Sequence, residues 1–138
     1  MRAVDTNVVI RLVVEDDEEQ GAAAAAAWRA LLASGGVFLS KVVIVEVAWV
    51  LRVSYRFDRQ ATATALRDLI DVEGVGVEDD AAVRRALCGF EASGADLSDH
   101  LILETARDAS ALPVLTFDRR FAREAGVALL SSGGALPK

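Results

Sequence analysis

The sequence predicts an α/β domain with three layers (α/β/α), in which a central parallel sheet of about four to five short strands lies between helices. Short, wholly apolar segments such as Val37–Leu39 alternate with longer segments of helical periodicity, an order typical of strand–helix–strand units. Strands without polar positions are buried on both faces, as in a parallel sheet. The 138 residues are about one domain's length, so we expect one domain over residues 1–131 and a loosely ordered tail over residues 132–138.

The first half of the chain shows clear element boundaries. A strand directly after Met1 breaks at Asp5, and the next helix ends in the acid-rich residues 15–19. An alanine run then favours a long helix, which Gly35 and Gly36 end. Ser40 is placed to cap the helix after the second strand. The expected elements are helices over residues 8–14, 20–34, 41–55 and 59–71, with a strand over residues 37–39.

The second half repeats the alternation with shorter elements. Acids at residues 78–80 suit the start of a helix, and Ser93–Gly94 breaks it. The expected elements here are helices over residues 81–92, 96–109 and 119–125, with strands over residues 75–77, 114–115 and 127–130.

Composition limits the class of protein. The chain is 53% hydrophobic with a mean hydropathy of +0.32, yet no apolar run approaches the ~18 residues of a membrane helix. We therefore expect no membrane association and surplus apolar surface that is covered by an oligomer or a partner. A single cysteine and the absence of a leader pattern make the cytoplasm the expected location. The net charge of −6 argues against nucleic-acid binding by bulk electrostatics.

Four carboxylates are expected at one edge of the sheet. Asp5 and Asp118 each follow a strand, and Glu46 and Asp99 lie in the first two turns of helices that begin at the carboxyl edge. Each has an alternative explanation. Asp5, Asp99 (with Asp96) and Asp118 could cap helices.

Glu46 has its own alternative. It is the only polar residue of the segment Val42–Leu51, which predicts a helix that is buried on all sides. A buried carboxylate needs a cation, which is either an arginine or a metal ion. Four acids together repel one another unless a divalent ion neutralises them, and an all-oxygen site suits Mg²⁺ or Mn²⁺.

These segments carry a resemblance to a known family. Val4–Asn7, Ser40–Leu51, Ala95–Ile102 and Leu115–Asp118 resemble the four acidic motifs of the PIN domain, and more narrowly the VapC toxins of toxin–antitoxin pairs. The similarity spans Met1 to about Leu130. It implies a Mg²⁺- or Mn²⁺-dependent endoribonuclease that hydrolyses RNA with a metal-activated water.

The resemblance also implies roles for individual residues. Asp5, Glu46, Asp99 and Asp118 match the metal ligands, with Asp96 as a secondary acid, and Thr6, Asn7, Ser40 and Thr116 match supporting polar residues. His100 is expected to face outward as a surface or groove residue. Partners would be an RNA substrate such as tRNA or another structured RNA, a cognate antitoxin and a second copy of the chain. Candidate phosphate contacts that offset the acidity are Arg11, Lys41, Arg119 and Arg120.

Other functions are less consistent with the residues. A receiver domain needs a phosphoacceptor aspartate and a late lysine, and an acid phosphatase needs Asp-x-Asp where this chain has Asp5–Asn7. A PIN nuclease that processes RNA without being a toxin, or a catalytically silent PIN-like binding module, stays open.

Overall fold

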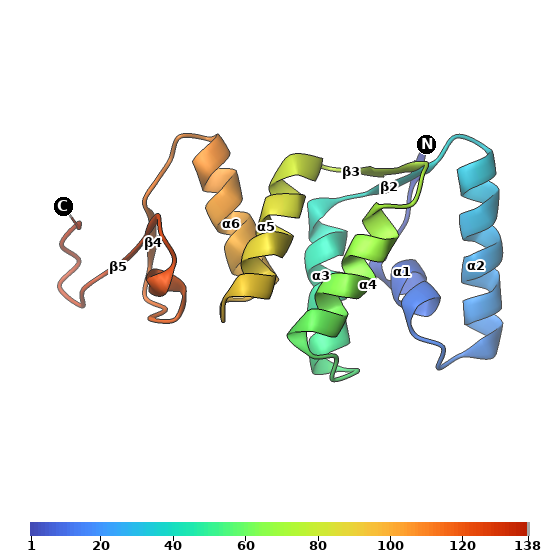
Figure 1. Ribbon diagram of the computed structural model, residues 1–138, viewed down its shortest axis with the longest axis horizontal. Coiled ribbons are helices and arrows are strands. Elements are labelled where there is room, and N and C mark those ends of the chain that lie inside the picture. The colour runs from blue at the N-terminus through green and yellow to red at the C-terminus, as the bar shows by residue number, and fades with distance from the viewer. Residues whose placement is uncertain (138) are drawn as a thin grey trace. The chain divides into compact units, whose positions relative to one another are not determined.

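The computed structural model describes residues 1–137 and divides the chain into two compact units, unit 1 over residues 1–80 and unit 2 from residue 81 onward. Both units combine helices with short parallel strands (Figure 1). This composition confirms the predicted α/β class and its parallel strands. The prediction that all strands share one central sheet in one domain stays a prediction.

Unit 1 is built on a parallel sheet with the strand order β1-β2-β3. Ala3 pairs with Phe38, and Phe38 in turn pairs with Gly76. The helices and strands that lie wholly within unit 1 are β1 (Arg2–Ala3), α1 (Thr6–Val13), α2 (Glu18–Ala33), β2 (Val37–Leu39), α3 (Lys41–Val53), α4 (Arg59–Ile70) and β3 (Val75–Val77).

The core of unit 1 lies between the sheet and these helices. Helix α1 packs against α2 and α3, and α3 packs against α4. Helix α2 contacts β2, and α4 contacts β3. The largest fully buried side chains here are Val9, Val37, Leu39, Ile44, Val47, Leu51, Thr62 and Leu66. Because the strands are parallel, the chain leaves β1, β2 and β3 at the same edge, where Asp5, Ser40 and Glu78 follow them.

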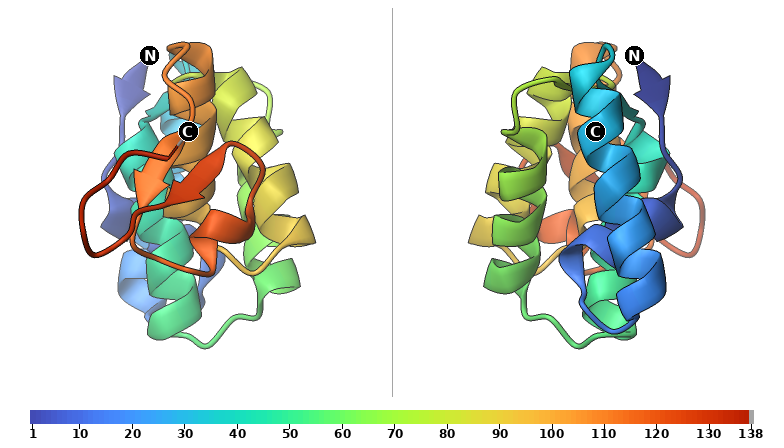
Figure 2. Two further views of the ribbon diagram at one scale, coloured as in Figure 1. Left: turned by 90° about the vertical axis from the view of Figure 1, so that its left-hand side faces the viewer. Right: turned by 90° about the vertical axis from the view of Figure 1, so that its right-hand side faces the viewer.

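Unit 2 contains a two-stranded parallel ladder beside two helices. Its elements are α5 (Asp80–Ala92), which begins at the boundary, α6 (Leu97–Asp108), β4 (Val114–Thr116), the 3₁₀ helix η1 (Phe121–Arg123) and β5 (Val127–Leu129). The paired strands β4 and β5 lie side by side in Figure 2. Leu103 and Phe121 form a buried cluster with Ala95, and Val114 and Val127 pack against it.

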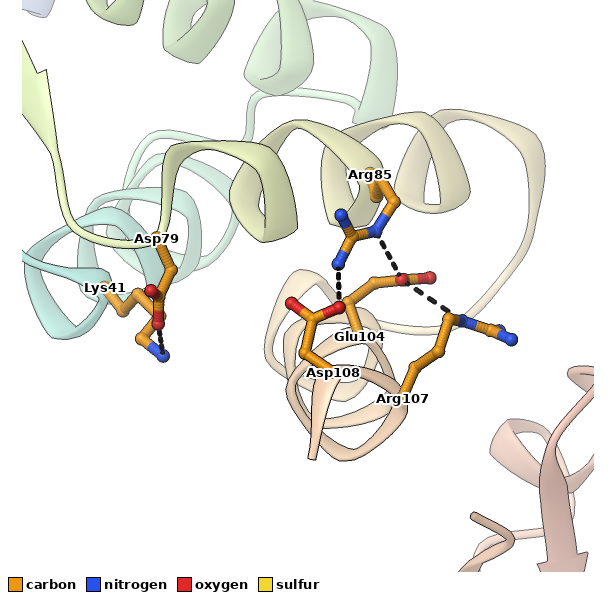
Figure 3. A network of polar contacts seen from close by, with 6 residues as sticks. All are labelled: Lys41, Asp79, Arg85, Glu104, Arg107 and Asp108. Atoms are coloured by element: carbon orange, nitrogen blue, oxygen red, sulfur yellow. Dashed lines mark hydrogen bonds and ion pairs between the residues drawn. The ribbon is translucent and has the colours of Figure 1, made fainter. Parts of the chain in front are cut away.

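A polar network joins α5 to α6 on the surface of unit 2. Arg85 Nε lies 2.8 Å from Glu104 Oε2, and Arg85 Nη2 lies 2.7 Å from Asp108 Oδ1 (Figure 3). Hydrogen bonds to Glu104 and then to Asp108 raise the pKa of Arg85 above its ordinary value. The Arg85 guanidinium thus bridges α5 and α6 through two carboxylates of α6.

The predicted helix and strand boundaries agree with the structure to within two residues. Helix α1 begins at Thr6, two residues before the predicted start, because Asp5 is already its N-cap. The helix predicted over residues 119–125 is only the 3₁₀ turn Phe121–Arg123. Residues 132–137 of the predicted tail contain no helix or strand, and Lys138 lies outside the described residues. Every helix of residues 1–137 is too short or too polar to span a bilayer.

The prediction that α3 is buried on all sides is wrong. Val42, Trp49 and Val53 are 65%, 63% and 58% exposed, and Glu46, which shares their face of the helix, is exposed as well. Helix α3 packs against α1 and α4 through Ile44, Val47, Ala48 and Leu51. An apolar sequence therefore fills the core side of α3 and also leaves an apolar stripe on the opposite side.

Candidate functional site

Thr6 connects two of the four predicted carboxylates within unit 1. Its side chain is 7% exposed, its backbone N–H donates to Asp5 Oδ1 over 2.6 Å, and its hydroxyl donates to Glu46 Oε2 over 2.6 Å. A residue at the first turn of α1 thus fixes one carboxylate from the end of β1 and one from the second turn of α3. The structure brings Asp5 and Glu46 together, as the sequence predicts.

Unit 2 gathers the remaining acids at the start of α6 and the end of β4. Asp99 Oδ2 accepts a hydrogen bond from the backbone N–H of Asp96 over 3.3 Å, as in a capping box. Thr116 Oγ1 accepts from the backbone N–H of Asp118 over 3.0 Å. Asp118 Oδ1 accepts from the backbone N–H groups of Arg120 and Phe121 over 2.8 and 3.2 Å.

Electrostatics link these acids. Burial raises the pKa of the Asp99 carboxyl above its ordinary value, and the nearby charges of Asp96 and Asp118 raise it further. The hydrogen bond from the Asp96 backbone and the proximity of His100 act in the opposite direction. A carboxylate whose charge is disfavoured by its surroundings is one that a cation would stabilise.

The four carboxylates share one feature of hydrogen bonding. Asp5, Asp99 and Asp118 each use a single oxygen for a hydrogen bond to the backbone, and Glu46 uses a single oxygen for the Thr6 hydroxyl. Among residues 1–137, none of the four forms an ion pair with lysine or arginine. The alternative in which an arginine neutralises Glu46 is therefore excluded for this part of the chain. Capping and metal binding are compatible, because each side chain keeps a second oxygen for a cation.

The donor set fits Mg²⁺ or Mn²⁺ in kind, since all its ligand atoms are carboxylate oxygens. Within the described residues 1–137, however, no group of three or more Asp, Glu, His or Cys side chains is arranged to hold a metal ion. Unit 1 provides Asp5 and Glu46, whereas Asp99 and Asp118, with the secondary Asp96, belong to unit 2.

Of the other predicted supporting residues, Ser40 forms a hydrogen bond near the sheet edge and the Asn7 side chain forms none within the part of the chain that the structure describes. Ser40 caps α3, because its hydroxyl accepts from the backbone N–H of Val43 over 3.2 Å. Glu78, which was not among the predicted site residues, follows β3, and its Oε1 accepts from the backbone N–H of Lys41 over 2.9 Å. Its place directly after a strand is the sequence feature that could have predicted it. Asn7 is exposed on α1, and its side chain makes no hydrogen bond among residues 1–137.

Two of the predicted phosphate contacts are used inside unit 1. Arg11 Nη1 pairs with Asp16 Oδ1 at 2.7 Å, and Arg11 Nε donates to Gln20 over 2.8 Å. Lys41 Nζ pairs with Asp79 Oδ2 at 2.6 Å (Figure 3). Arg11 lies in the last turn of α1, so it points its charge at the acid-rich segment after that helix and away from the edge that carries Asp5. Arg11 is therefore not one of the RNA contacts that we propose.

The prediction that His100 faces outward is wrong. Its side chain is buried at 3% exposure, and Nε2 lies 2.8 Å from Ser93 Oγ and 4.0 Å from Glu124 Oε1. The ring packs against Gly89 of α5, where a Cβ atom would lie 2.8 Å from His100 Cε1. A glycine eleven residues earlier provides the space that His100 fills.

Comparisons with known proteins identify a matching family and a similar solved structure. The family model described as PIN domain matches residues 2–127, a range that spans elements of both units. A solved structure, Mycobacterium tuberculosis VapC20, a toxin that cleaves the sarcin-ricin loop, is 20% identical in sequence. The match covers 92% of this chain and 97% of that one, with a TM-score of 0.40. No curated protein matches the sequence.

Proposed function

The chain belongs to the PIN domain family, and on that premise we propose that it is a Mg²⁺- or Mn²⁺-dependent endoribonuclease. The observation that carries the proposal is the shared state of Asp5, Glu46, Asp99 and Asp118. Each keeps one oxygen outside the protein's own hydrogen bonds, and none pairs with lysine or arginine among residues 1–137. Carboxylates that keep an oxygen without a hydrogen bond and have no lysine or arginine partner are suited to binding a divalent cation.

We further propose that Asp5, Glu46, Asp99 and Asp118 are the metal ligands. The family match covers the segments that carry all four. Asp5 and Asp118 each follow a parallel strand, and ligands bind beyond the carboxyl ends of such strands.

Each of these residues has a proposed role in phosphodiester hydrolysis. A bound divalent ion would supply an activated water and charge neutralisation at the phosphate. Thr6 holds the Asp5 and Glu46 carboxylates in place, and the Asp96 and Arg120 backbone N–H groups hold Asp99 and Asp118. Lys41 and Arg119 are the cations we propose for contact with substrate phosphates. One histidine in the chain, buried against α5, leaves no pair for a metal-free acid–base mechanism.

The biological role we propose is that of a VapC-like toxin with a protein antitoxin, acting in the cytoplasm on tRNA or another structured RNA. This part of the proposal rests on the resemblance of the four acidic sequence motifs to those of VapC toxins. Expression should slow growth, and co-expression of the protein from an adjacent small gene should restore it. Growth unaffected by an active nuclease would favour the RNA-processing alternative.

Metal removal gives the direct test of the activity. The purified chain, freed of any partner, is expected to cleave a structured RNA in Mg²⁺ or Mn²⁺ and to lose cleavage in EDTA, because four carboxylates cannot position water at a phosphate without a cation. Gel analysis of a labelled RNA stem-loop measures both states. Readdition of Mg²⁺ should restore activity. Cleavage at full rate in EDTA would refute the metal mechanism, and absence of cleavage in either metal would favour a silent binding module.

The exposed stripe of α3 leads us to propose a homodimer. Val42, Trp49 and Val53 lie at positions i, i+7 and i+11 and so share one helix face. Large exposed apolar side chains on one helix face mark an interaction surface, and a second copy of the chain is the occupant we propose. The stripe also carries Glu46, so dimerisation would place the partner beside a site carboxylate.

The dimer proposal predicts a sharp effect of charge at Trp49. Trp49→Glu is expected to raise the dimer dissociation constant by about 30-fold or more, since a buried interface tryptophan often contributes at least ~2 kcal/mol. Sedimentation velocity across a concentration series measures the constant. Val72→Glu, which charges another exposed apolar position of unit 1, is the matched control and should leave it unchanged. Equal effects of the two substitutions would contradict an interface on α3.

A further inference from the structure

The loop between α5 and α6 is fastened at two points. At one, Ser93 Oγ lies 2.8 Å from the buried His100 Nε2. At the other, Arg120 Nη1 donates to the carbonyl oxygen of Gly94 over 3.1 Å. The loop leads directly into Asp96 and the first turn of α6, which carries Asp99. Its position therefore decides where these two acids lie within unit 2.

Arg120 connects the loop between α5 and α6 to Asp118. The backbone N–H of Arg120 donates to Asp118 Oδ1 over 2.8 Å, while its guanidinium reaches Gly94. The aliphatic part of the side chain crosses Gly94, where a Cβ atom would lie 3.5 Å from Arg120 Cδ. One residue thus contacts the segment of Asp118 through its backbone and the segment of Asp96 and Asp99 through its side chain.

We infer that Arg120 is a positioning residue that sets the spacing between Asp118 and Asp99 for the divalent ion, and that it is not a phosphate contact. This inference rests on the proposed function. Residues that orient ligands from outside the ligand shell typically change metal affinity or activity by about 10- to 100-fold when they are removed. The sequence-based expectation for Arg120 was RNA contact, which would instead change RNA affinity and its salt dependence.

Arg119 is the matched control. It precedes Arg120 in the same turn, is exposed, and forms no hydrogen bond or ion pair among residues 1–137. Arg119→Ala and Arg120→Ala remove the same charge from adjacent positions, but only Arg120→Ala removes the contact with Gly94. A difference in metal affinity between the two variants therefore reports the contact and not the charge.

The test measures Mn²⁺ binding and RNA binding separately on the full chain. Mn²⁺ affinity is followed by electron paramagnetic resonance of the unbound ion, and RNA affinity is followed in EDTA with a fluorescein-labelled stem-loop. Arg120→Ala is expected to weaken Mn²⁺ binding by about 10-fold and to leave RNA binding in EDTA unchanged. Arg119→Ala is expected to leave Mn²⁺ binding unchanged. Thermal melting in EDTA identifies any variant whose fold is damaged.

The outcomes separate the inference from the function on which it rests. Equal Mn²⁺ affinity for wild type and Arg120→Ala overturns the inference and leaves the nuclease proposal standing. Weaker RNA binding in EDTA by Arg120→Ala, with Mn²⁺ binding intact, also overturns it and assigns Arg120 to the substrate. A wild-type chain that binds no Mn²⁺ and cuts no RNA overturns both. If Arg120→Ala melts far below wild type in EDTA, Arg120→Lys replaces it, since lysine keeps the charge and the backbone contact while losing the guanidinium.

Discussion

Asparagine in place of Asp5 or Asp99 is expected to lower Mg²⁺-dependent RNA cleavage by about 1,000-fold or more while leaving the fold intact. The loss follows because an uncharged amide removes one carboxylate from the ion, and a few kcal/mol of lost transition-state stabilisation corresponds to about three powers of ten in rate. The fold is preserved because asparagine caps a helix about as well as aspartate. Its Oδ1 can still accept the hydrogen bond from the Thr6 or Asp96 backbone N–H.

Single-turnover cleavage of a labelled RNA measures the rate, and thermal melting in EDTA checks the fold. Asp58→Asn is the matched control, because Asp58 caps α4 through a 2.7 Å hydrogen bond from the Ala61 backbone N–H and belongs to no site. The double variant Asp5→Asn/Asp99→Asn should be no slower than either single variant, since the effects of removing residues that share one catalytic function are not additive. Full activity of Asp5→Asn would reduce Asp5 to a helix cap and end the four-acid proposal.

The sequence was informative about the acids because their positions are tied to local structure. Asp5, Asp96 and Asp118 each occupy a helix or turn start, and a start of that kind is visible in the order of residue types. The link from Thr6 to Glu46 joins residues forty positions apart. The sequence predicts only that the segments of Asp5 and Glu46 meet at one edge of the sheet, because both follow neighbouring parallel strands, and it does not predict this hydrogen bond.

Side-chain environment was less predictable, and α3 and His100 show why. The segment Val42–Leu51 contains enough apolar residues for a fully buried helix, but the number of apolar residues does not say whether the chain itself or a partner covers them. The burial of His100 depends on Gly89, whose missing side chain leaves room for the ring. Periodicity along one helix carries no information about a cavity provided by another.

Alanine in place of Gly89 is expected to destabilise the protein by about 2–4 kcal/mol, although alanine normally favours a helix by ~1 kcal/mol over glycine. The new methyl group would lie against His100 Nδ1 and 2.8 Å from Cε1. His100 is buried at 3% exposure, so the ring cannot swing into solvent without breaking its contact with Ser93. The steric cost and the lost hydrogen bond together exceed the gain in helix propensity. Urea denaturation followed by circular dichroism measures the difference.

Gly21→Ala provides the comparison that isolates the contact from the propensity. Gly21 also lies inside a helix, α2, and a Cβ atom there would meet only the Arg11 carbonyl oxygen at 3.7 Å, an ordinary contact. That variant should be more stable than wild type by up to ~1 kcal/mol. The two glycine-to-alanine changes are thus expected to have opposite signs. A Gly89→Ala protein as stable as wild type would mean that the ring moves readily, and the assignment of His100 as a fixed anchor for the loop before Asp96 would then be wrong.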